Sequence, residues 1–539
     1  MKIARCYAWV LACALAVGCL SGCQWGAGAP AETRIALSDD EIQTEGVNRE
    51  GVIVGGDIIY YEDRDTYESG NPYGEGEAAD RHSAEEAAAH MVVNITQPGT
   101  YRLTGKLSKG QIRVDLGEDA RTDPAAAVTL VLDGVDISCG VAPAILFLNV
   151  YECDHDWSAE SATKDVDTSA AGANLLLAEG STNVVNGSYV ARIYKDAEGE
   201  KKLWKQDGAI YSYMSMNVDG RGELVVNAEN EGVDTELHLT INGGDVSIFA
   251  QNDGINTNED GVSVTTINGG TLHIVAGLGK EGDGIDSNGW LVINGGDVFS
   301  SAHPAADAGL DSDMGSYING GRVWAFGSTM DWAESDSGQV TVNLQFAEGM
   351  SAKSLLKILD KDGNGILAPR AVEEDDPTAD RTYRGAIISD PLLKQGETYT
   401  VYVDEVQQAY TGTDVMRGPG GFGGGRPGGQ MGQPPEGGMP NFQGGERPNF
   451  PEGQMPEGGK GGRPQGEMPK WENGEMPDFG QGQMPQIPEG EMPDLTEGEM
   501  PPYASLWTPG QQSGEQMPPS TEFYMQDMVN FFSGVAAAE

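Results

Sequence analysis

The tetrapeptide INGG occurs four times, and its even spacing limits the fold of this chain more than any other feature. The copies begin at Ile241, Ile267, Ile293 and Ile318, which are 26, 26 and 25 residues apart. Short segments in which apolar and polar residues alternate lie between them, cut by Gly, Asn and Asp, which is the pattern of strands and turns. Repeats of this length built only from strands and turns are typical of a solenoid, whose neighbouring coils complete each other's core.

Each repeat is expected to contribute three strands. The first ends at INGG, as in LHLTINGG, the second follows, as in DVSIFA, and the third carries a short acidic motif. Three strands in roughly 22–26 residues match one coil of a parallel β-helix. Residues 35–338 are therefore predicted to form an all-β solenoid in which each coil adds about 4.8 Å of height. Leu239 and Ile241 are expected to point inward, whereas His238 and Thr240 point outward.

The acidic motif aligns in four copies. They are EGVDTE from Glu231, DGINTN from Asp253, DGIDSN from Asp283 and AGLDSD from Ala308. The third position is always apolar and is expected to be the inward residue of the third strand. The second is always Gly, which suits a sharp corner or a positive φ. Equivalent positions of a parallel solenoid stack on one another, so the other positions form columns of oxygen atoms.

Stacked carboxylates repel one another, and either a hard cation or alternation with Asn relieves the repulsion. Ca²⁺ takes about six to eight oxygen ligands, which Asp, Asn and backbone carbonyls supply. The columns predict a Ca²⁺ site, with a purely structural polar ladder as the alternative. The candidate ligands are Asp234, Asp253, Asn256, Asn258, Asp283, Asp286, Asn288, Asp311 and Asp313. The asparagines of INGG are expected to form an amide ladder and nothing more.

The acidic composition narrows the possible partners. The chain has 539 residues, of which 33 are basic and 83 acidic, for a formal net charge of −50. A nucleic-acid partner is not expected because no basic patch is present. A bare anionic lipid or polysaccharide would be repelled unless divalent cations reversed the local charge. The composition fits either an extracellular surface that stays soluble through its charge or a protein that works with Ca²⁺. The chain is expected to be a monomer.

Residues 1–23 are expected to be a lipoprotein signal peptide. Lys2 and Arg5 precede a short apolar run, and LSGC, ending at Cys23, looks like a bacterial lipobox. An ordinary cleaved signal is the alternative. Lipidation of Cys23 would anchor an exported protein to the bacterial cell membrane without a spanning helix, with residues 24–34 as a tether.

Export would leave only two cysteines that carry no lipid. Of the six in the chain, Cys139 and Cys153 lie beyond the signal. Outside the cytoplasm they are expected to form one disulfide, with two buried thiols as the alternative.

The repeats stop near residue 338. Residues 339–412 alternate as expected for a small β module, whereas residues 413–505 are rich in Gly, Pro, Met and Glu. A segment of that composition cannot bury a core and is predicted to be disordered. The final residues, 506–539, have apolar side chains at helical spacing and are expected to form either a short docking helix or a continued disordered tail.

These motifs in their order resemble a known family, the secreted carbohydrate-binding β-helix proteins of cellulolytic clostridia. The resemblance begins with ITQPGTYRLTGKL from Ile95 and continues through VTLVLDGVDI, LLLAEGSTNVVNG, DGAIYS and the INGG and DGI repeats. It implies a right-handed parallel β-helix similar to that of pectate-degrading lyases. It also implies Ca²⁺-associated binding of cellulose-like or acidic galacturonan chains, without established catalysis. The insert from Tyr151 to Ala173 and the copy at Ala308 depart from the family pattern.

Three functions remain open. The first is polysaccharide binding on outward aromatic side chains. The second is a Ca²⁺-dependent lyase acting on a uronate polymer, with Lys280 as the base. The third is a structural cell-surface spacer, which would bind no saccharide. The aromatic candidates, which alternatively cap the solenoid or pack under the C-terminal module, are Trp290, Tyr317, Trp324 and Trp332.

Overall fold

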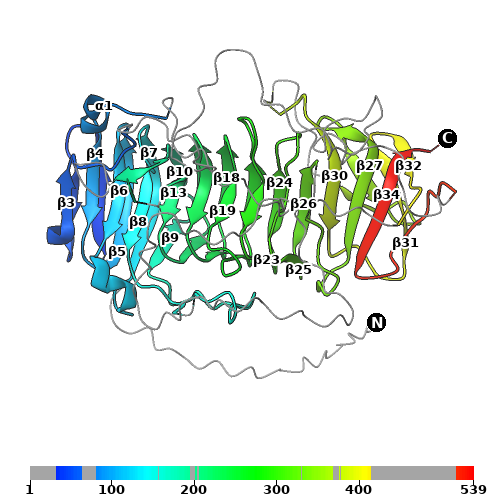
Figure 1. Ribbon diagram of the computed structural model, residues 1–539, viewed down its shortest axis with the longest axis horizontal. Helices are drawn as coiled ribbons and strands as arrows, with labels where there is room; N and C mark the ends of the chain where they lie inside the picture. The colour runs from blue at the N-terminus through cyan, green and yellow to red at the C-terminus, as the bar shows by residue number, and fades with distance from the viewer. Residues whose placement is uncertain are drawn as a thin grey trace, which may run out of the picture.

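The computed structural model is built almost entirely of strands that stand side by side along one long axis (Figure 1). It describes residues 32–62, 80–155, 157–194, 201–202, 205–328, 331–367, 376, 378–413 and 518–538. Chain order follows this axis, from β3 at one end to the β31, β32 and β34 group at the other (Figure 1). Within these residues no helix is long and apolar enough to cross a membrane. The axis therefore runs across the strands, and a coil is the unit that repeats along it.

Most strands pair in parallel with the equivalent strand of the next coil, which produces three ladders. The first ladder contains β9 (Ala173–Leu177), β14 (Met216–Gly220), β17 (Leu239–Ile241), β20 (Val264–Ile267), β23 (Trp290–Ile293) and β25 (Gly315–Ile318). The second contains β10 (Thr182–Gly187), β15 (Glu223–Ala228), β18 (Asp245–Ala250), β21 (Thr271–Val275), β24 (Asp297–Ser301) and β26 (Arg322–Gly327). The third contains β4 (Met91–Ile95), β6 (Gly110–Asp115), β8 (Ile145–Asn149), β13 (Gly208–Ser212), β16 (Glu231–Thr235), β19 (Ile255–Thr257) and β22 (Ile285–Ser287). Three strands per coil is the arrangement that the repeats predict.

The inward positions of the three ladders form one continuous core. Leu239 and Ile241 of the first ladder and Val246 and Ile248 of the second are buried in it. The apolar residue of the acidic motif belongs to the same core. These residues stack in register on successive coils, as Val233, Ile255, Ile285 and Leu310. The apolar residue at the third position of the acidic motif, such as Ile285, is therefore the inward residue of the third strand, as expected.

The glycine of the acidic motif is needed for close approach between coils. Gly254 and Gly284 do not have positive φ. A Cβ added to Gly284 would collide with Ser300 Oγ and with the carbonyl oxygen of Gly309. A positive φ occurs instead at the second glycine of each INGG, for example 87° at Gly270 and 88° at Gly296. The glycine of the acidic motif therefore allows close packing between coils, whereas the second glycine of INGG allows the turn.

The INGG asparagines form the expected amide ladder. Asn268 donates to Asn242 Oδ1 at 2.9 Å, and Asn294 donates to Asn268 Oδ1 at 3.0 Å. Asn319 continues the ladder on Asn294 at 3.0 Å. Each amide both donates and accepts along the axis, so the ladder locks the register of the coils without any ion.

Irregular strands close the N-terminal end of the stack. β1 (Thr33–Leu37) pairs in parallel with β5 (Gly99–Leu107), which pairs with β7 (Val128–Cys139). Antiparallel additions are β2 (Gln43–Glu45) on β1 and β3 (Val52–Gly55) on β4. The helix α1 (Ala84–Ala88) begins with a capping box, in which Ser83 and Glu86 exchange hydrogen bonds. Other short elements are the 3₁₀ turns Arg49–Gly51 and Glu118–Thr122 and the hairpin of β11 (Ile193–Tyr194) and β12 (Lys201–Lys202).

The insert between β8 and β9 lies against the outer face of the first ladder. Thr168 Oγ1 donates to Thr240 Oγ1 at 2.7 Å, and Asn217 Nδ2 donates to the Thr168 carbonyl at 2.8 Å. Asp154 pairs with His238 Nε2 at 3.2 Å. His238 and Thr240 point outward as expected, yet both are buried because the insert covers them.

Within residues 518–538 the chain forms two strands, so the expectation of a helix or a disordered tail over 506–539 is wrong for this part. The module consists of β27 (Thr341–Ser351), β28 (Leu356–Leu359), β29 (Gly365–Leu367), β30 (Thr382–Ser389), β31 (Thr398–Val403), β32 (Val406–Ala409), β33 (Phe523–Tyr524) and β34 (Val529–Ala537). β34 pairs in parallel with β27 and antiparallel with β32 (Figure 1). Phe532 and Val535 both lie in the module core although they are three residues apart, because the pairing of β34 with β27 shifts register between them. Residues 414–517 lie outside the described part of the chain.

The expected disulfide is also wrong, because both cysteines are free thiols. Cys139 ends β7 inside the main core, whereas Cys153 packs beside the small cluster of Ala120, Ala126 and Tyr151. Burial raises the pKa of the Cys139 thiol to about 11 and that of Cys153 to about 12. Neither thiol is poised to react at neutral pH.

We expect Gly284→Ala to destabilise the solenoid by roughly 1–3 kcal/mol, because the added methyl forces two packed coils apart. Urea unfolding followed by circular dichroism measures the change. Gly140→Ala is the matched control, since a Cβ there meets nothing within 4 Å. Equal stability of the two variants would contradict the close-approach explanation.

We expect Phe532→Ala to destabilise the C-terminal module by about 3–5 kcal/mol, the usual cost of removing a buried ring. The fluorescence of Trp324, which lies in the same core, would report the transition. Tyr524→Ala, which removes a side chain that is 50% exposed, is expected to cost less than about 1 kcal/mol. Matching losses in both variants would show that β34 is not an integral strand.

Candidate functional site

Three carboxylates meet inside the third ladder, and together they are called the acidic triad: Asp207, Glu231 and Asp234. One oxygen of each lies within 4.8 Å of the others, and all three side chains are buried. Glu231 and Asp234 lie on β16, and Asp207 directly precedes β13, the parallel neighbour of β16. The stacking of two coils therefore concentrates negative charge at one buried point.

Burying these carboxylates in their charged form is energetically unfavourable. Burial raises the pKa of Glu231 to about 7, and the nearby charge of Asp207 adds to the increase. The pKa of Asp234 is also raised, first by burial and then by repulsion from Glu231 and Asp207. Either a proton or a cation must neutralise part of the triad at neutral pH.

Three buried oxygen atoms beside the triad have no hydrogen-bond partner. They are Glu231 Oε2, Asp234 Oδ2 and Asn256 Oδ1, although Asn256 Nδ2 donates to Glu231 Oε1 at 3.3 Å. Buried polar atoms almost always have a partner, so a set of unpartnered oxygens marks a place where a cation or a water molecule would be held. A set made only of carboxylate and amide oxygens fits Ca²⁺ or Mg²⁺ and does not fit Zn²⁺, which prefers nitrogen and sulfur.

Lys205 provides a positive charge beside the triad. Its ammonium group forms an ion pair with Asp207, while its side chain remains half exposed. Attraction to Asp207 raises the pKa of Lys205. From the next coil, Asn258 Nδ2 donates to Asp234 Oδ1 at 2.7 Å. Asn258, which was predicted to bind metal, therefore acts as a hydrogen-bond donor to this aspartate.

Four further aspartates form a longer acidic column along the same ladder: Asp253, Asp283, Asp286 and Asp311. Burial raises the pKa of the first three, and repulsion within the column adds to the effect. Two of them bind backbone amides of the following coil. Asp253 accepts from the Asp283 amide at 2.6 Å, and Asp283 accepts from the Ala308 amide at 2.5 Å.

The nine predicted metal ligands are thus divided by the structure. Asp234 joins the acidic triad and Asn256 borders it, whereas the acidic column lies farther along the axis. Asn288 donates to the Asn258 carbonyl at 2.8 Å, which is a structural ladder contact. Asp313 is exposed.

Sequence reasoning missed Asp207, which completes the triad. The segment DGAIYS is a further copy of the acidic motif, but Ala209 adds one residue between its glycine and its inward residue, Ile210. The observed register places Ile210 opposite Val233 and Gly208 opposite Glu231. Aligning the copies on their inward residue, with a gap allowed, would have placed Asp207 next to Glu231.

The predicted aromatic platform does not exist as an exposed surface. Trp290, Trp324 and Trp332 are only 9%, 4% and 8% exposed. Trp290 packs with Val264 and Val292, and the insert and Tyr317 cover this cluster. Trp324 belongs to the C-terminal core, and Trp332 contacts Phe531 of β34 with ring centroids 6.2 Å apart. The alternative, that such rings pack under the C-terminal module, holds for Trp324 and Trp332, whereas the insert covers Trp290.

Two other predicted residues remain, Lys280 and Cys23. Lys280 is exposed in the connection between β21 and β22. Cys23, the predicted lipidation site, lies outside the described residues.

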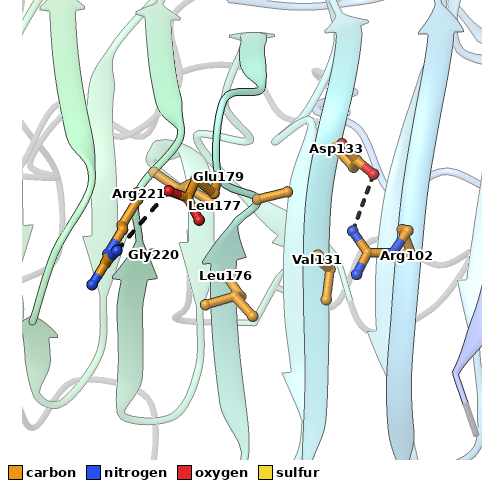
Figure 2. A pocket seen from close by; sticks show the side chains of 9 residues that line it. Arg102, Val131, Asp133, Leu176, Leu177, Glu179, Gly220 and Arg221 are labelled. Atoms are coloured by element: carbon orange, nitrogen blue, oxygen red, sulfur yellow. Dashed lines mark hydrogen bonds and ion pairs between the residues drawn. The ribbon is translucent and has the colours of Figure 1, made fainter. Parts of the chain in front are cut away.

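A shallow depression of about 410 Å³ on the outer face is flanked by Arg102 and Arg221 (Figure 2). Arg102 pairs with Asp133 at 3.0 Å, and Arg221 approaches Glu179 at 4.0 Å (Figure 2). Leu176 lies between the two pairs, and both members of the second pair are 80% exposed. Exposed pairs of this kind contribute little energy, and each arginine already faces a carboxylate, so the depression offers no strong anion site.

Comparison with known proteins adds a family to this geometry. A family profile described as "Carbohydrate-binding domain-containing protein" matches residues 89–364. A protein with the same description from Acetivibrio thermocellus is 30% identical over 159 residues, which cover 29% of this chain and 45% of that protein. The chain therefore spans about half the length of this relative.

One solved structure is also similar, a "polysaccharide lyase-like protein from C. thermocellum" in a gadolinium derivative. It is 22% identical, with a TM-score of 0.32 over 54% of this chain and 92% of that chain. A similarity this low carries no argument about fold or activity.

We expect the metal-free protein to lose stability as pH rises from about 4.5 to about 7, the interval that separates the usual pKa of Glu231 from its raised one. Across this interval the folded state holds a proton that the unfolded chain has released, so the unfolding free energy falls, by roughly 1–3 kcal/mol. Melting temperatures measured in chelator would show this slope. Glu231→Gln should flatten it, whereas Glu229→Gln, at an exposed site, should not; an unchanged slope in Glu231→Gln would contradict the triad's role.

Proposed function

The chain belongs to the family of carbohydrate-binding domain-containing proteins, and we propose that it binds polysaccharide at the cell surface without cleaving it. The observation that carries this proposal is the family match over residues 89–364, which includes most of the solenoid and the whole acidic triad. An extended stack of coils suits a polymer, because equivalent outward positions recur at every coil along the axis.

Ca²⁺ at the acidic triad is the second part of the proposal. Glu231, Asp234 and Asn256 supply three buried oxygen atoms that have no hydrogen-bond partner. Asp207 adds a carboxylate whose present partner, Lys205, has a half-exposed side chain and can move aside. A divalent cation would remove the repulsion that raises the pKa of these acids.

The burial of the triad limits what such an ion can do. Glu231 is 3% exposed and Asp234 is fully buried, so a cation held by them contacts no polymer. Its effect is to hold the coils of β13, β16 and β19 in register. Of the two polymer classes considered, acidic galacturonan and cellulose-like chains, this site favours neither.

Neither of the two candidate bases, Lys205 and Lys280, supports the lyase alternative. A general base must be deprotonated near the working pH. Lys205 lies beside the triad, but Asp207 raises its pKa and keeps it protonated. Lys280 is exposed in the connection that leads to β22, two coils beyond β16, so it does not adjoin the proposed ion.

We also propose right-handed winding of the coils, a parallel β-helix, and export with a lipid on Cys23. Parallel strands joined by a crossover within one sheet are right-handed in about 98% of cases, which supports the first point. The basic and apolar residues before Cys23 support the second. A Cys23→Ala variant released from the membrane fraction would agree with the anchor, whereas one retained there would contradict it.

The test of binding and of Ca²⁺ uses the full chain, because a form ending at residue 412 would lose β33 and β34. Retention is measured on insoluble polygalacturonate and on cellulose, with Ca²⁺ and with a chelator. We expect retention on at least one polymer and a Ca²⁺-induced rise of several degrees in melting temperature. No retention on either would overturn the binding proposal and favour the spacer.

Asp234→Asn should abolish the Ca²⁺-induced rise in melting temperature, because it removes a buried charge from the proposed ligand set. Glu229→Gln is the control and should preserve the rise. A rise that survives in Asp234→Asn would exclude the triad as the Ca²⁺ site and leave polysaccharide binding untouched.

A further inference from the structure

A row of aromatic side chains lies along the outer face of the second ladder, away from the acidic triad. The outward residues at the middle of β21, β24 and β26 are His273, Phe299 and Trp324, each opposite the next in register. Phe249 joins from β18, with its ring 6.1 Å from that of His273. The rings of His273 and Phe299 are 4.9 Å apart, and Phe299 lies 5.8 Å from Phe326.

The two ends of this row have different surroundings. Trp324 and Phe326 are buried in the core of the C-terminal module. Phe249 and Phe299 are half-buried, and His273 is exposed. The three accessible side chains, Phe249, His273 and Phe299, are called the ring row below.

We propose that the ring row is a stacking surface for a neutral polysaccharide that runs along the solenoid axis, across the strands. This inference rests on the proposed function, and it names the contact residues and the class of polymer. The match to the carbohydrate-binding family covers all three residues.

The spacing of the rings favours a polymer in this direction. Neighbouring strands lie about 4.8 Å apart, so each coil advances the axis by that distance. A pyranose unit of an extended β-linked chain advances by a similar distance. A chain laid along the axis therefore brings successive sugars over successive coils in near register. Along a strand, by contrast, every second residue points into the core and offers no contact.

The ring chemistry suits the apolar face of a sugar. The C–H groups of a pyranose ring form a flat apolar face, and aromatic side chains bury large area with few rotatable bonds. Although the His273 side chain reaches the surface, surrounding protein atoms partly desolvate its ring and lower the pKa of His273, which favours the neutral imidazole at pH 7. The row is thus three uncharged rings in line.

The charges beside the row favour a neutral polymer over a uronate. Asp245 and Asp297 lie exposed on the same strands as Phe249 and Phe299. Asp297 is paired with Arg322 at 3.2 Å, whereas Asp245 and Asp376 both act on His273 through their negative charge. These carboxylates accept hydrogen bonds from sugar hydroxyls and repel a uronate carboxylate.

The residues were readable in the sequence once the second strands are aligned. DVSIFA, TLHIVA and DVFSSA place Ser247, His273 and Phe299 at one column, and RVWAFG adds Trp324. The sequence signal for the ring row is this column of equivalent positions, whose residues are aromatic in the C-terminal coils. A ladder of rings that only stabilises the stack would show the same column, so the experiment must separate the two roles.

The experiment measures depletion of the full chain from solution by microcrystalline cellulose in the presence of chelator. Phe249→Ala/His273→Ala is compared with the unaltered chain and with Leu392→Ala, which removes an apolar side chain that is 63% exposed on the C-terminal module. We expect the double variant to lose about tenfold in partition coefficient, the effect of two stacking contacts. Leu392→Ala should bind as the unaltered chain does. Phe249→Tyr, which keeps the ring, should also retain binding.

The outcomes separate this inference from the proposed function. If the unaltered chain binds neither cellulose nor polygalacturonate, the proposed function fails. If it binds cellulose and the double variant binds equally, the rings do not contact the polymer and the inference is overturned. If it binds only polygalacturonate, the neutral-polymer inference is overturned while the proposed function stands.

Discussion

The parallel pairing of equivalent strands is the constraint on which the rest of this structure depends. Because each coil sits directly above the previous one, any residue type that recurs in the repeat becomes a column with a spacing of about 4.8 Å. Val233, Ile255, Ile285 and Leu310 make such a column of core residues, and the INGG asparagines make one of amides. The same rule that stabilises apolar and amide columns concentrates charge when the column is acidic. The buried triad and the raised pKa values along the third ladder follow from it.

The repeat made the solenoid core predictable, because its period and its inward positions are both visible in the sequence. Leu239 and Ile241 are buried as expected, Val246 and Ile248 lie in the same core, and the apolar residue of the acidic motif is the inward residue of its strand. Positions outside the repeat were less predictable. The apolar residues near Phe532 fit a helix by spacing alone, and only the free edges of β27 and β32 select a strand there. Local pattern does not record which edge is available in the folded protein.

The candidate site was predictable in kind and only partly in membership. Asp234 and the column of Asp253, Asp283 and Asp286 were recognised because they recur at fixed motif positions. Asp207 was missed because Ala209 shifts its copy by one residue. The tryptophans were misjudged for a different reason. Trp290 does point outward from its ladder, but the insert, which has no repeat of its own, covers it. Outward orientation follows from alternation, whereas exposure depends on segments that lie far away in the sequence.

The outer surfaces of the three ladders are therefore not equivalent, and this difference decides where a polymer can bind. The insert covers the first ladder, through contacts such as that of Thr168 with Thr240. The third ladder carries buried acids, whose charge is directed at neighbouring coils through bonds such as that of Asp253 with the Asp283 amide. The second ladder keeps rings accessible at Phe249, His273 and Phe299 before the C-terminal module covers Trp324. An uncharged polymer can bind that face of this strongly acidic chain without electrostatic repulsion. Any bound cation would instead act inside the stack.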